Sequence, residues 1–598
     1  MKNIALSSLA LLLITACSDQ AAPRAQVATN QASQPEGQQE EDSLASIMED
    51  HWALVLEENP VLAEQLGEAS GRGRLPDASL EAYAEGVEAR RALLARLNEL
   101  EGGNLAPEED LNRRLLMTEL EDEIESSQTG GRYLTITTYS APHLGFVRLA
   151  ERASLRRRED IDSYLARLDA MPDAMDAVIA RLSEAVDEGW TQPCKAMEGH
   201  ERTYRTHLVG TPEESAFYAP LTTSDRATDA DRESAARLIE EGVLPAFQRF
   251  AAFYEGTYRP ACRQDVGASS FPGGEDFYAY RTRSYTTTDM TPDEVHEVGL
   301  SEVARIRAEM EEVAGEAGFA DLASFQQYLR TDPKFYPETA EERLAAASVI
   351  AKKMDGKLVE LFTVLPRMPY DIQPIPLDVA EGTTTAYYSG PAADGTRGGT
   401  YWLNTTKLET RPLYELEALT LHEAVPGHHL QVALTQELDL PEFRRFGGFT
   451  AFTEGWGLYS ERLGLETGFY DAPETDFGRL SYEMWRACRL VVDTGMHAKG
   501  WSRQEAIDYM LENTGLSENN ITREVDRYIT WPGQALAYKI GELKIRELRE
   551  RAESELGESF DVRRFHDAVL ANGALPLSIL EEEIERFIEE EQENAGRG

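Results

Sequence analysis

Three histidines and a glutamate lie within residues 422–429. Zinc hydrolases use such a cluster on a helix, where two neutral imidazoles hold the ion and a glutamate activates the bound water as general base. We therefore expect His422 and His428 to be zinc ligands and Glu423 to be the base. A catalytic zinc ion takes three protein ligands, and Glu454, in a helical stretch 26 residues after His428, is the candidate for the third.

The spacing of these histidines departs from the usual H-E-x-x-H pattern, in which the ligands are four residues apart on one helical face. His428 follows His422 by six residues, about 240° away from that face, whereas His429 is aligned but about 10.5 Å along the axis. Proline and glycine break helical regularity, so Pro426 and Gly427 would loop out and return His428 to the ligand position. His429 remains the alternative ligand. A helix end with merely hydrogen-bonded histidines is the second alternative.

The elements that must position these residues are mostly helices. Apolar residues recur at three- and four-residue spacing over long windows, and capping boxes such as Thr291–Glu294 and Ser502–Glu505 begin several of them. No internal repeat or later linker interrupts the pattern. We expect one large, mostly α domain over residues 46–598, arranged as one body or as two lobes. The helical windows are 44–67, 78–100, 108–127, 158–189, 229–256, 292–314 and 340–365.

Strand-like stretches are few. Residues 132–140 have the composition of a strand, and residues 383–389 and 400–403 form a plausible antiparallel pair just before the histidine cluster. Three glycines and a proline between them predict a mobile turn at residues 390–399. The sequence thus predicts a small antiparallel sheet beside the zinc helix.

The composition excludes some classes of partner. The chain has 598 residues with 59 Lys and Arg against 106 Asp and Glu, a formal net charge of −47. Its apolar content of 42% and aromatic content of 9% are those of a packed protein. So negative a charge repels phosphate backbones, which argues against nucleic acid, and it makes anionic lipid headgroups a poor docking surface.

The N-terminus carries a targeting signal. A short basic start precedes an apolar run, Ile4–Ile14, that is too short to cross a bilayer as a mature helix. Small residues then precede Cys17 in a pattern that resembles the bacterial lipobox, whose cysteine is acylated. We therefore expect residues 1–17 to be a lipoprotein signal peptide with a lipobox. The alternative is an ordinary signal peptide cleaved near Ala16.

The segment after Cys17 is polar. Residues 18–45 are low in aromatics and rich in Gln, Ser, Pro and Glu, which predicts a flexible tether. Ser18, rather than Asp, follows the cysteine, and this resembles lipoproteins of the outer membrane. We expect the body to be held in the cell envelope by the lipid alone, at the outer membrane and facing the periplasm.

Three further cysteines bear on the fold, because an oxidising compartment permits disulfides. Cys194 and Cys262 both lie just after prolines, at the ends of long helical patterns. We expect these two to pair and Cys488 to be buried on a helix. Three free thiols are the alternative.

Three segments resemble one bacterial family. Residues 422–431, 454–461 and 531–541 look like the lipoprotein family catalogued as domain of unknown function eight hundred and eighty-five, and the resemblance covers most of the chain after the tether. That family is similar to the gluzincin zinc metallopeptidases of the thimet-oligopeptidase, angiotensin-converting and carboxypeptidase Taq groups. The resemblance implies a largely helical protein with a deep substrate channel between two halves, with the zinc ligands and base named above.

The resemblance also implies residues that act on the substrate. Gluzincins of this type place a tyrosine late in the chain to donate a hydrogen bond to the tetrahedral oxyanion, and Tyr538 is the candidate. An aromatic packed in the core of its helix is the alternative. A histidine often assists that tyrosine, and none precedes Trp531 closely, so His497 is the candidate for this role. A structural histidine is the alternative there.

Substrate contacts follow from the same resemblance. Gluzincins run an edge strand beside the zinc helix, and an extended peptide can add to it through main-chain hydrogen bonds. Tyr388 and Tyr401 lie in the two candidate strands. Arg527 is the candidate for binding a substrate carboxylate. A plain packed hairpin and a structural arginine are the alternatives.

The sequence therefore predicts a zinc-dependent hydrolase of peptide bonds, with Zn as its cofactor and peptides as its substrates. Two alternatives stay open. One is a zinc hydrolase of a cell-wall amide or another non-peptide bond, and the other is a non-catalytic envelope binding lipoprotein. The sequence predicts neither the cleavage specificity nor the oligomeric state.

Overall fold

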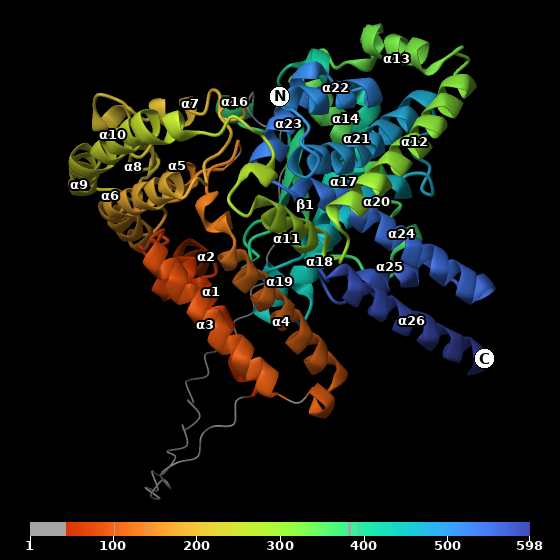
Figure 1. The fold of residues 1–598 in the computed structure, drawn as a ribbon, viewed down its shortest axis with the longest axis horizontal. Coiled ribbons are helices and arrows are strands. Elements are labelled where there is room, and N and C mark those ends of the chain that lie inside the picture. Colours follow the sequence, from red (N-terminus) through yellow and green to blue (C-terminus); the bar gives the residue numbers. More distant parts are fainter. Residues whose placement is uncertain (1–42, 101, 139, 381–383, 394, 598) are drawn as a thin grey trace, which may run out of the picture. The chain divides into compact units, whose positions relative to one another are not determined.

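The computed structural model describes residues 43–597, except 101, 139, 381–383 and 394 (Figure 1). The chain divides into two compact units, Met1–Asp42 and Ser43–Gly598, and every described element belongs to the second. Cys17, the signal peptide and most of the expected tether lie outside the described residues.

Helices dominate the described chain, as predicted, and every predicted window contains at least one α-helix. Capping contributes to these boundaries: Thr291 accepts a hydrogen bond from the backbone N–H of Glu294, and Ser502 does the same for Glu505. The α-helices are α1 Leu44–Glu58, α2 Pro60–Gln65, α3 Leu80–Glu99, α4 Pro107–Gln128, α5 Pro142–Glu151, α6 Arg158–Asp187, α7 Arg202–Arg205, α8 Ala219–Thr223, α9 Asp229–Leu238, α10 Leu244–Phe253, α11 Gly274–Thr286, α12 Pro292–Glu316, α13 Leu322–Thr331, α14 Ala340–Asp355, α15 Leu358–Leu361, α16 Leu377–Ala380, α17 Leu416–Glu423, α18 His428–Glu437, α19 Glu442–Phe446, α20 Thr450–Leu463, α21 Pro473–His497, α22 Arg503–Asn513, α23 Glu518–Thr530, α24 Ala537–Leu556, α25 Val562–Leu570 and α26 Leu577–Arg597.

Two large hydrophobic clusters form the core of this unit. The larger joins α1, α3 and α4 to the elements from α12 onward. The second is built from residues between Ile136 and Tyr258, drawn in orange and yellow in Figure 1. Cys194, within this segment, and Cys262, just after it, form the predicted disulfide, and Cys488 is a buried free cysteine on α21, also as predicted.

Helix α21 is the most deeply buried long element, since every residue from Phe477 to His497 is buried. A helix that carries charges can be buried on all sides only if those charges are paired. Its arginines meet this condition: Arg479 pairs with Glu483, and Arg489 pairs with Glu524. Helix α12 packs along α21, and α24 packs along α20. These packed helices support the histidine cluster.

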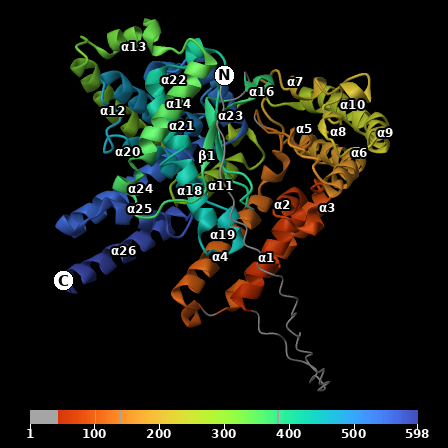
Figure 2. The ribbon, with the colours of Figure 1, turned by 180° about the vertical axis from the view of Figure 1, so that it is seen from behind.

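The small sheet is mixed rather than purely antiparallel. Strands β2 Ala386–Ser389 and β3 Gly399–Leu403 form the predicted antiparallel pair, and the unpredicted strand β1 Tyr370–Pro374 lies parallel to β3. The order is β1-β3-β2, so β3 is central. Helix α18 packs against the sheet, as the view from behind shows (Figure 2).

The prediction of a strand at residues 132–140 is wrong. Gly130–Tyr133 is a 3₁₀ helix, and the described residues that follow form no strand. Other groups satisfy this backbone in place of a strand ladder: the side-chain amide of Gln192 donates to the carbonyl of Ile136 (2.8 Å), and Thr530 Oγ1 accepts from the backbone N–H of Thr138 (3.2 Å).

Among the described residues, no helix combines the length and the apolar character that crossing a bilayer requires.

Candidate metal centre

The turn between the two expected histidine ligands interrupts the helix instead of bulging within it. Helix α17 ends at Glu423 and α18 begins at His428. The backbone N–H of Gly427 donates to the carbonyl of Leu421 (2.9 Å), which closes the turn. A Cβ atom at Gly427 would lie 1.9 Å from the carbonyl oxygen of His422, so only glycine allows this close approach.

The turn brings His422 and His428 beside Glu454 of α20. One ligand atom from each residue lies within 4.8 Å of the other two. Oε2 of Glu454 is 3.8 Å from Nε2 of His422 and 3.5 Å from Nε2 of His428. The side chain of His422 is 4% exposed, whereas those of His428 and Glu454 are 13% and 20% exposed. The cluster is therefore buried at its base and accessible on one side.

This geometry fits a zinc ion. Two ligand atoms about 2.1 Å from one tetrahedral ion lie about 3.4 Å apart, close to the two distances to the Glu454 carboxylate. Two imidazole nitrogens and a carboxylate oxygen are a ligand set of catalytic zinc, which leaves a fourth position open. The three residues predicted from the sequence therefore form a group that could hold the metal.

A second carboxylate orients His422. Oε1 of Glu461 lies 2.8 Å from Nδ1 of His422, so the opposite nitrogen, Nε2, faces the cluster. The guanidinium of Arg486 lies 3.3 Å from the same carboxylate oxygen. Both Glu461 and Arg486 are buried. Histidine ligands of metals commonly have such a carboxylate partner, which fixes the tautomer and the ring orientation.

Helix α20 presents one continuous face to the cluster. Glu454, Gly457 and Glu461 are three and then four residues apart, the spacing of neighbours on a helix surface. A Cβ atom at Gly457 would lie 2.8 Å from Cε1 of His422 and 3.1 Å from Cε1 of His428. The sequence reasoning gave Gly457 and Glu461 no role, although this helical spacing was the signal that could have found them.

The pKa values of Glu423 and Glu454 shift in opposite directions. Burial raises the pKa of Glu423, which suits a general base near neutral pH. Burial also opposes the charge of Glu454, but its interactions with His422 and His428 hold its pKa well below the usual range. Such opposed environments commonly separate a proton-transferring carboxylate from an ionised one. Burial opposes the charge of His422 too, yet Glu454 and Glu461 raise its pKa to about 9.

His429 lies outside the cluster. Its Nδ1 is 2.9 Å from the hydroxyl of Tyr388, and its Nε2 is 3.0 Å from the carbonyl oxygen of Met368. Burial lowers the pKa of His429 to about 4, so the ring is neutral. Of the two alternatives at this position, the structure brings His428 to the cluster, and His429 joins α18 to the sheet.

The two tyrosines expected to bind substrate are placed differently. Tyr401 is fully buried on β3, which is flanked by strands on both sides, so the expectation of an edge strand at Tyr401 is wrong. Tyr388 lies on β2, an edge strand, but its hydroxyl contacts His429.

Tyr538 lies beside the cluster. Its ring stacks on that of His422 with centroids 6.5 Å apart, and the guanidinium carbon of Arg489 lies 4.4 Å from its centroid. Nη2 of Arg527 donates to its hydroxyl (3.3 Å) and to the side-chain oxygen of Gln534 (2.6 Å). The structure therefore brings Arg527 and Tyr538 together next to His422.

His497 is not part of this group. Its Nδ1 accepts a hydrogen bond from the backbone N–H of Ala268 (2.9 Å), and its Nε2 donates to the carbonyl of Tyr528 (3.0 Å). Burial lowers its pKa to about 3. Because both nitrogens are used by the backbone, the expectation that His497 assists Tyr538 is wrong, and its alternative, a structural histidine, describes it.

The fold and the cluster together define a mostly helical protein with a candidate His-His-Glu metal centre. Residues 60–584 match the family described as "Bacterial protein of unknown function (DUF885)". The match spans most of the chain, so the chain belongs to this family, as its motifs indicated.

Solved structures share the fold. A crystal structure of the "putative lipoprotein from Colwellia psychrerythraea" aligns with a TM-score of 0.85 at 27% identity, over 92% of this chain and 99% of that one. A second, the "putative lipoprotein of unknown function from Shewanella oneidensis", aligns with a TM-score of 0.72 at 17% identity, over 90% and 99%. None of the curated proteins matches the chain. The relationship to gluzincins stays a prediction.

Proposed function

We propose that this protein is a zinc-dependent hydrolase of peptide bonds. The observation that supports the proposal best is the convergence of His422, His428 and Glu454 from three helices, with Glu423 adjacent in sequence and buried. The two glutamates suit different roles: the histidines lower the pKa of Glu454, which suits a ligand of a cation, whereas burial raises the pKa of Glu423, which suits proton transfer.

The chain's own residues suggest the steps of hydrolysis. When bound, zinc would polarise the peptide carbonyl and make a water molecule more acidic. Glu423 takes one proton from the attacking water, whose oxygen bonds to the carbonyl carbon. Glu423 then gives that proton to the leaving nitrogen as the carbon–nitrogen bond breaks, which yields a carboxylic acid and an amine, and the acid passes its remaining proton to the amine or to water. Tyr538, whose ring stacks on that of His422, would donate a hydrogen bond to the oxyanion.

We also propose that the protein acts in the cell envelope, anchored by lipid on Cys17. The lipobox-like end of the N-terminal apolar run supports this, and the two similar solved structures are each described as a "putative lipoprotein". Mass measurement of the mature N-terminal peptide tests it. Acylated Cys17 at the N-terminus is expected, and an unmodified N-terminus would refute the anchor.

Metal content and hydrolysis should be measured on the same purified proteins. We expect the parent and Glu423→Gln to hold one zinc ion per chain and His422→Ala to hold none, by elemental analysis. Glu423→Gln should lose hydrolysis of a peptide library, because amide side chains do not accept a proton from water. The control is Glu409→Gln, an exposed change near the start of α17, which should keep the parent rate.

The outcomes separate the alternatives. Hydrolysis by Glu423→Gln at the parent rate would contradict the mechanism. Cleavage of muropeptides without cleavage of peptides would favour the cell-wall amide, and a parent without zinc would favour a binding lipoprotein.

A further inference from the structure

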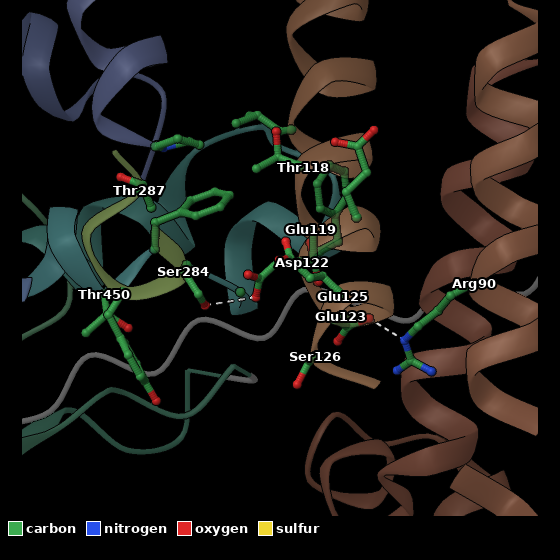
Figure 3. A pocket seen from close by; sticks show the side chains of 18 of the residues that line it. Arg90, Thr118, Glu119, Asp122, Glu123, Glu125, Ser126, Ser284, Thr287 and Thr450 are labelled. Atoms are coloured by element: carbon green, nitrogen blue, oxygen red, sulfur yellow. Dashed lines mark hydrogen bonds and ion pairs between the residues drawn. The ribbon is translucent and has the colours of Figure 1, made fainter. Parts of the chain in front are cut away.

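A cavity of about 1550 Å³ lies between α3 and α4 on one side and α11, the start of α20 and the start of α26 on the other (Figure 3). Glu119 and Asp122 project from α4, and Ser284 and Thr287 lie on the facing wall. The cavity is large enough for several residues of an extended peptide.

Helix α20 contributes to both the cavity and the candidate metal centre. Thr450 lines it, and Glu454 follows Thr450 by four residues on α20, so the two side chains share one helical face about one turn apart. A second link comes from α11. Tyr285 lines the cavity, and its hydroxyl accepts a hydrogen bond from Nε1 of Trp531 (2.6 Å), in the segment that leads to Tyr538.

Two of the five carboxylates that α4 contributes to the cavity have a cationic partner. Arg90 pairs with Glu123, and also with Glu58 of α1, and Arg283 pairs with Glu125. These pairs neutralise part of the negative charge on this wall.

Glu119 and Asp122 differ from their neighbours. Among the described residues, neither forms an ion pair with a lysine or an arginine, and Asp122 accepts a hydrogen bond only from neutral side chains such as Ser284 (3.1 Å). The two carboxylates are three residues apart on one face of α4. The cavity therefore carries two neighbouring carboxylates that form no ion pair with a lysine or an arginine, although the charge of Arg90 acts on Glu119 and that of Arg281 acts on Asp122.

His51, which lies next to Glu119, does not supply a positive charge to this carboxylate. His51 is fully buried, and neither of its ring nitrogens has a hydrogen-bond partner among the described residues. Its Nε2 points at Oε1 of Glu119 from 3.8 Å. Burial, helped by the charge of Arg90, lowers the pKa of His51 to about 4, so the ring is neutral.

The same environment makes the two carboxylates costly to ionise. Burial, together with repulsion from Glu123, raises the pKa of Glu119 to about 8, and burial raises that of Asp122. A positively charged group in the cavity would relieve both costs through charge-assisted hydrogen bonds.

We propose that substrates approach the metal centre through this cavity and that Glu119 and Asp122 select peptides carrying a positive charge. The group recognised is an ammonium or guanidinium, from a lysine or arginine side chain or from a free peptide N-terminus. The assignment of a peptide as the ligand rests on the proposed function. The cavity and its two carboxylates are independent of that function.

The test measures binding rather than turnover. Full-length protein carrying Glu423→Gln is titrated with three fluorescein-labelled hexapeptides that differ in charge. The first has a central lysine and both ends capped, the second replaces lysine by uncharged norleucine, and the third is the norleucine peptide with a free N-terminus. We expect the lysine peptide, the free N-terminal peptide or both to bind at least tenfold more tightly than the capped norleucine peptide, and the arm that gains affinity identifies the cationic group.

Two double variants decide the role of the carboxylates. Glu119→Gln with Asp122→Asn should abolish the preference for the charged peptide and keep the affinity for the capped norleucine peptide. The matched control removes two exposed charges, one from α3 and one from α4, by Glu88→Gln with Glu108→Gln, and should keep the preference. Urea unfolding of each variant establishes that it is folded.

The proposal is overturned if the parent binds all three peptides equally, if it binds none of them, or if the Glu119/Asp122 variant keeps the preference. Failure of the proposed function has a different signature. A preference for cationic peptides that depends on Glu119 and Asp122, in a protein that neither holds zinc nor hydrolyses peptides, would support the cavity and refute the hydrolase.

Discussion

Glu461 acts on the candidate metal centre through another residue. It contacts Nδ1 of His422, and the interaction directs Nε2 toward His428 and Glu454. Its partner Arg486 is as buried as the carboxylate itself. Glu461 is therefore a positioning residue, and its contribution should be measurable as metal affinity.

We predict that Glu461→Gln weakens zinc binding by about 10–100-fold, the usual effect of removing a carboxylate that orients a histidine ligand. Competition with a chromogenic chelator measures the dissociation constant. Glu466→Gln is the matched control, because Glu466 follows the same helix but pairs with Arg549 at a more exposed position. Equal zinc affinity in parent and Glu461→Gln would refute the positioning role.

At the scale of single residues, the sequence could predict the three ligands, because their types and order carry the chemistry. It could not predict the environment of His497, since the groups that occupy its two nitrogens, Ala268 N–H and the Tyr528 carbonyl, lie far away in sequence and on different elements. The prediction of an edge strand at Tyr401 failed for a related reason. Whether a strand is central or at an edge depends on the strands that pair with it.

The position of helix α20 against the two histidines requires a glycine at residue 457. Gly457 lies between the two glutamates of its metal-facing surface, and both histidine rings pack where a Cβ atom would be. Such a contact makes the element's placement, rather than its helical propensity, sensitive to one methyl group.

We predict that Gly457→Ala lowers zinc affinity at least tenfold, because one of the two rings must move away from the ion. Equilibrium dialysis with zinc measures the change. Gly315→Ala is the control, since it lies in α12 with nothing within 4 Å of its added Cβ atom. That control should keep zinc and gain about 0.5–1 kcal/mol of stability from helix propensity. Unchanged zinc affinity in Gly457→Ala would contradict the packing argument.

At the scale of elements, helices were predictable because amphipathic periodicity persists over whole windows. Strands were not. Residues 132–140 have strand-like residues but no partner strand, and side chains such as Gln192 bind their backbone instead. Strand β1 was missed because its identity comes from pairing with β3, from Tyr370 opposite Gly399 to Pro374 opposite Leu403, and its own composition is rich in loop-forming residues.

The described chain contains two large hydrophobic clusters, and the disulfide joins the segment that forms the second of them to the residues that follow it. Cys194 and Cys262 close a stretch of 68 residues that includes α7 to α10. The ligands of the candidate metal centre come from α17, α18 and α20, which belong to the larger cluster.

We predict that Cys194→Ser with Cys262→Ser lowers the free energy of unfolding by about 2–5 kcal/mol, because the open chain regains conformational entropy when unfolded. Urea denaturation measures the loss. Zinc content should stay at the parent value, because the ligands lie in the other cluster. A double variant as stable as the parent would contradict this expectation.

At this scale the sequence could indicate one large helical body but not the cavity beside α4. The walls come from segments separated by hundreds of residues, among them α4, α11 and the start of α26. The charge balance inside the cavity also depends on which acids meet an arginine, as Glu123 does and Asp122 does not. Neither the walls of the cavity nor its charge balance produces a local pattern in the sequence.

The position of the disulfide along the chain has a consequence for biogenesis. If the protein is exported N-terminus first, Cys194 and Cys262 emerge into the oxidising compartment well before Cys488 does. The correct partners therefore meet while the third thiol is still behind them, and burial on α21 later hides that thiol from thiol–disulfide exchange. Order of emergence, followed by burial, protects this three-cysteine body from mispairing.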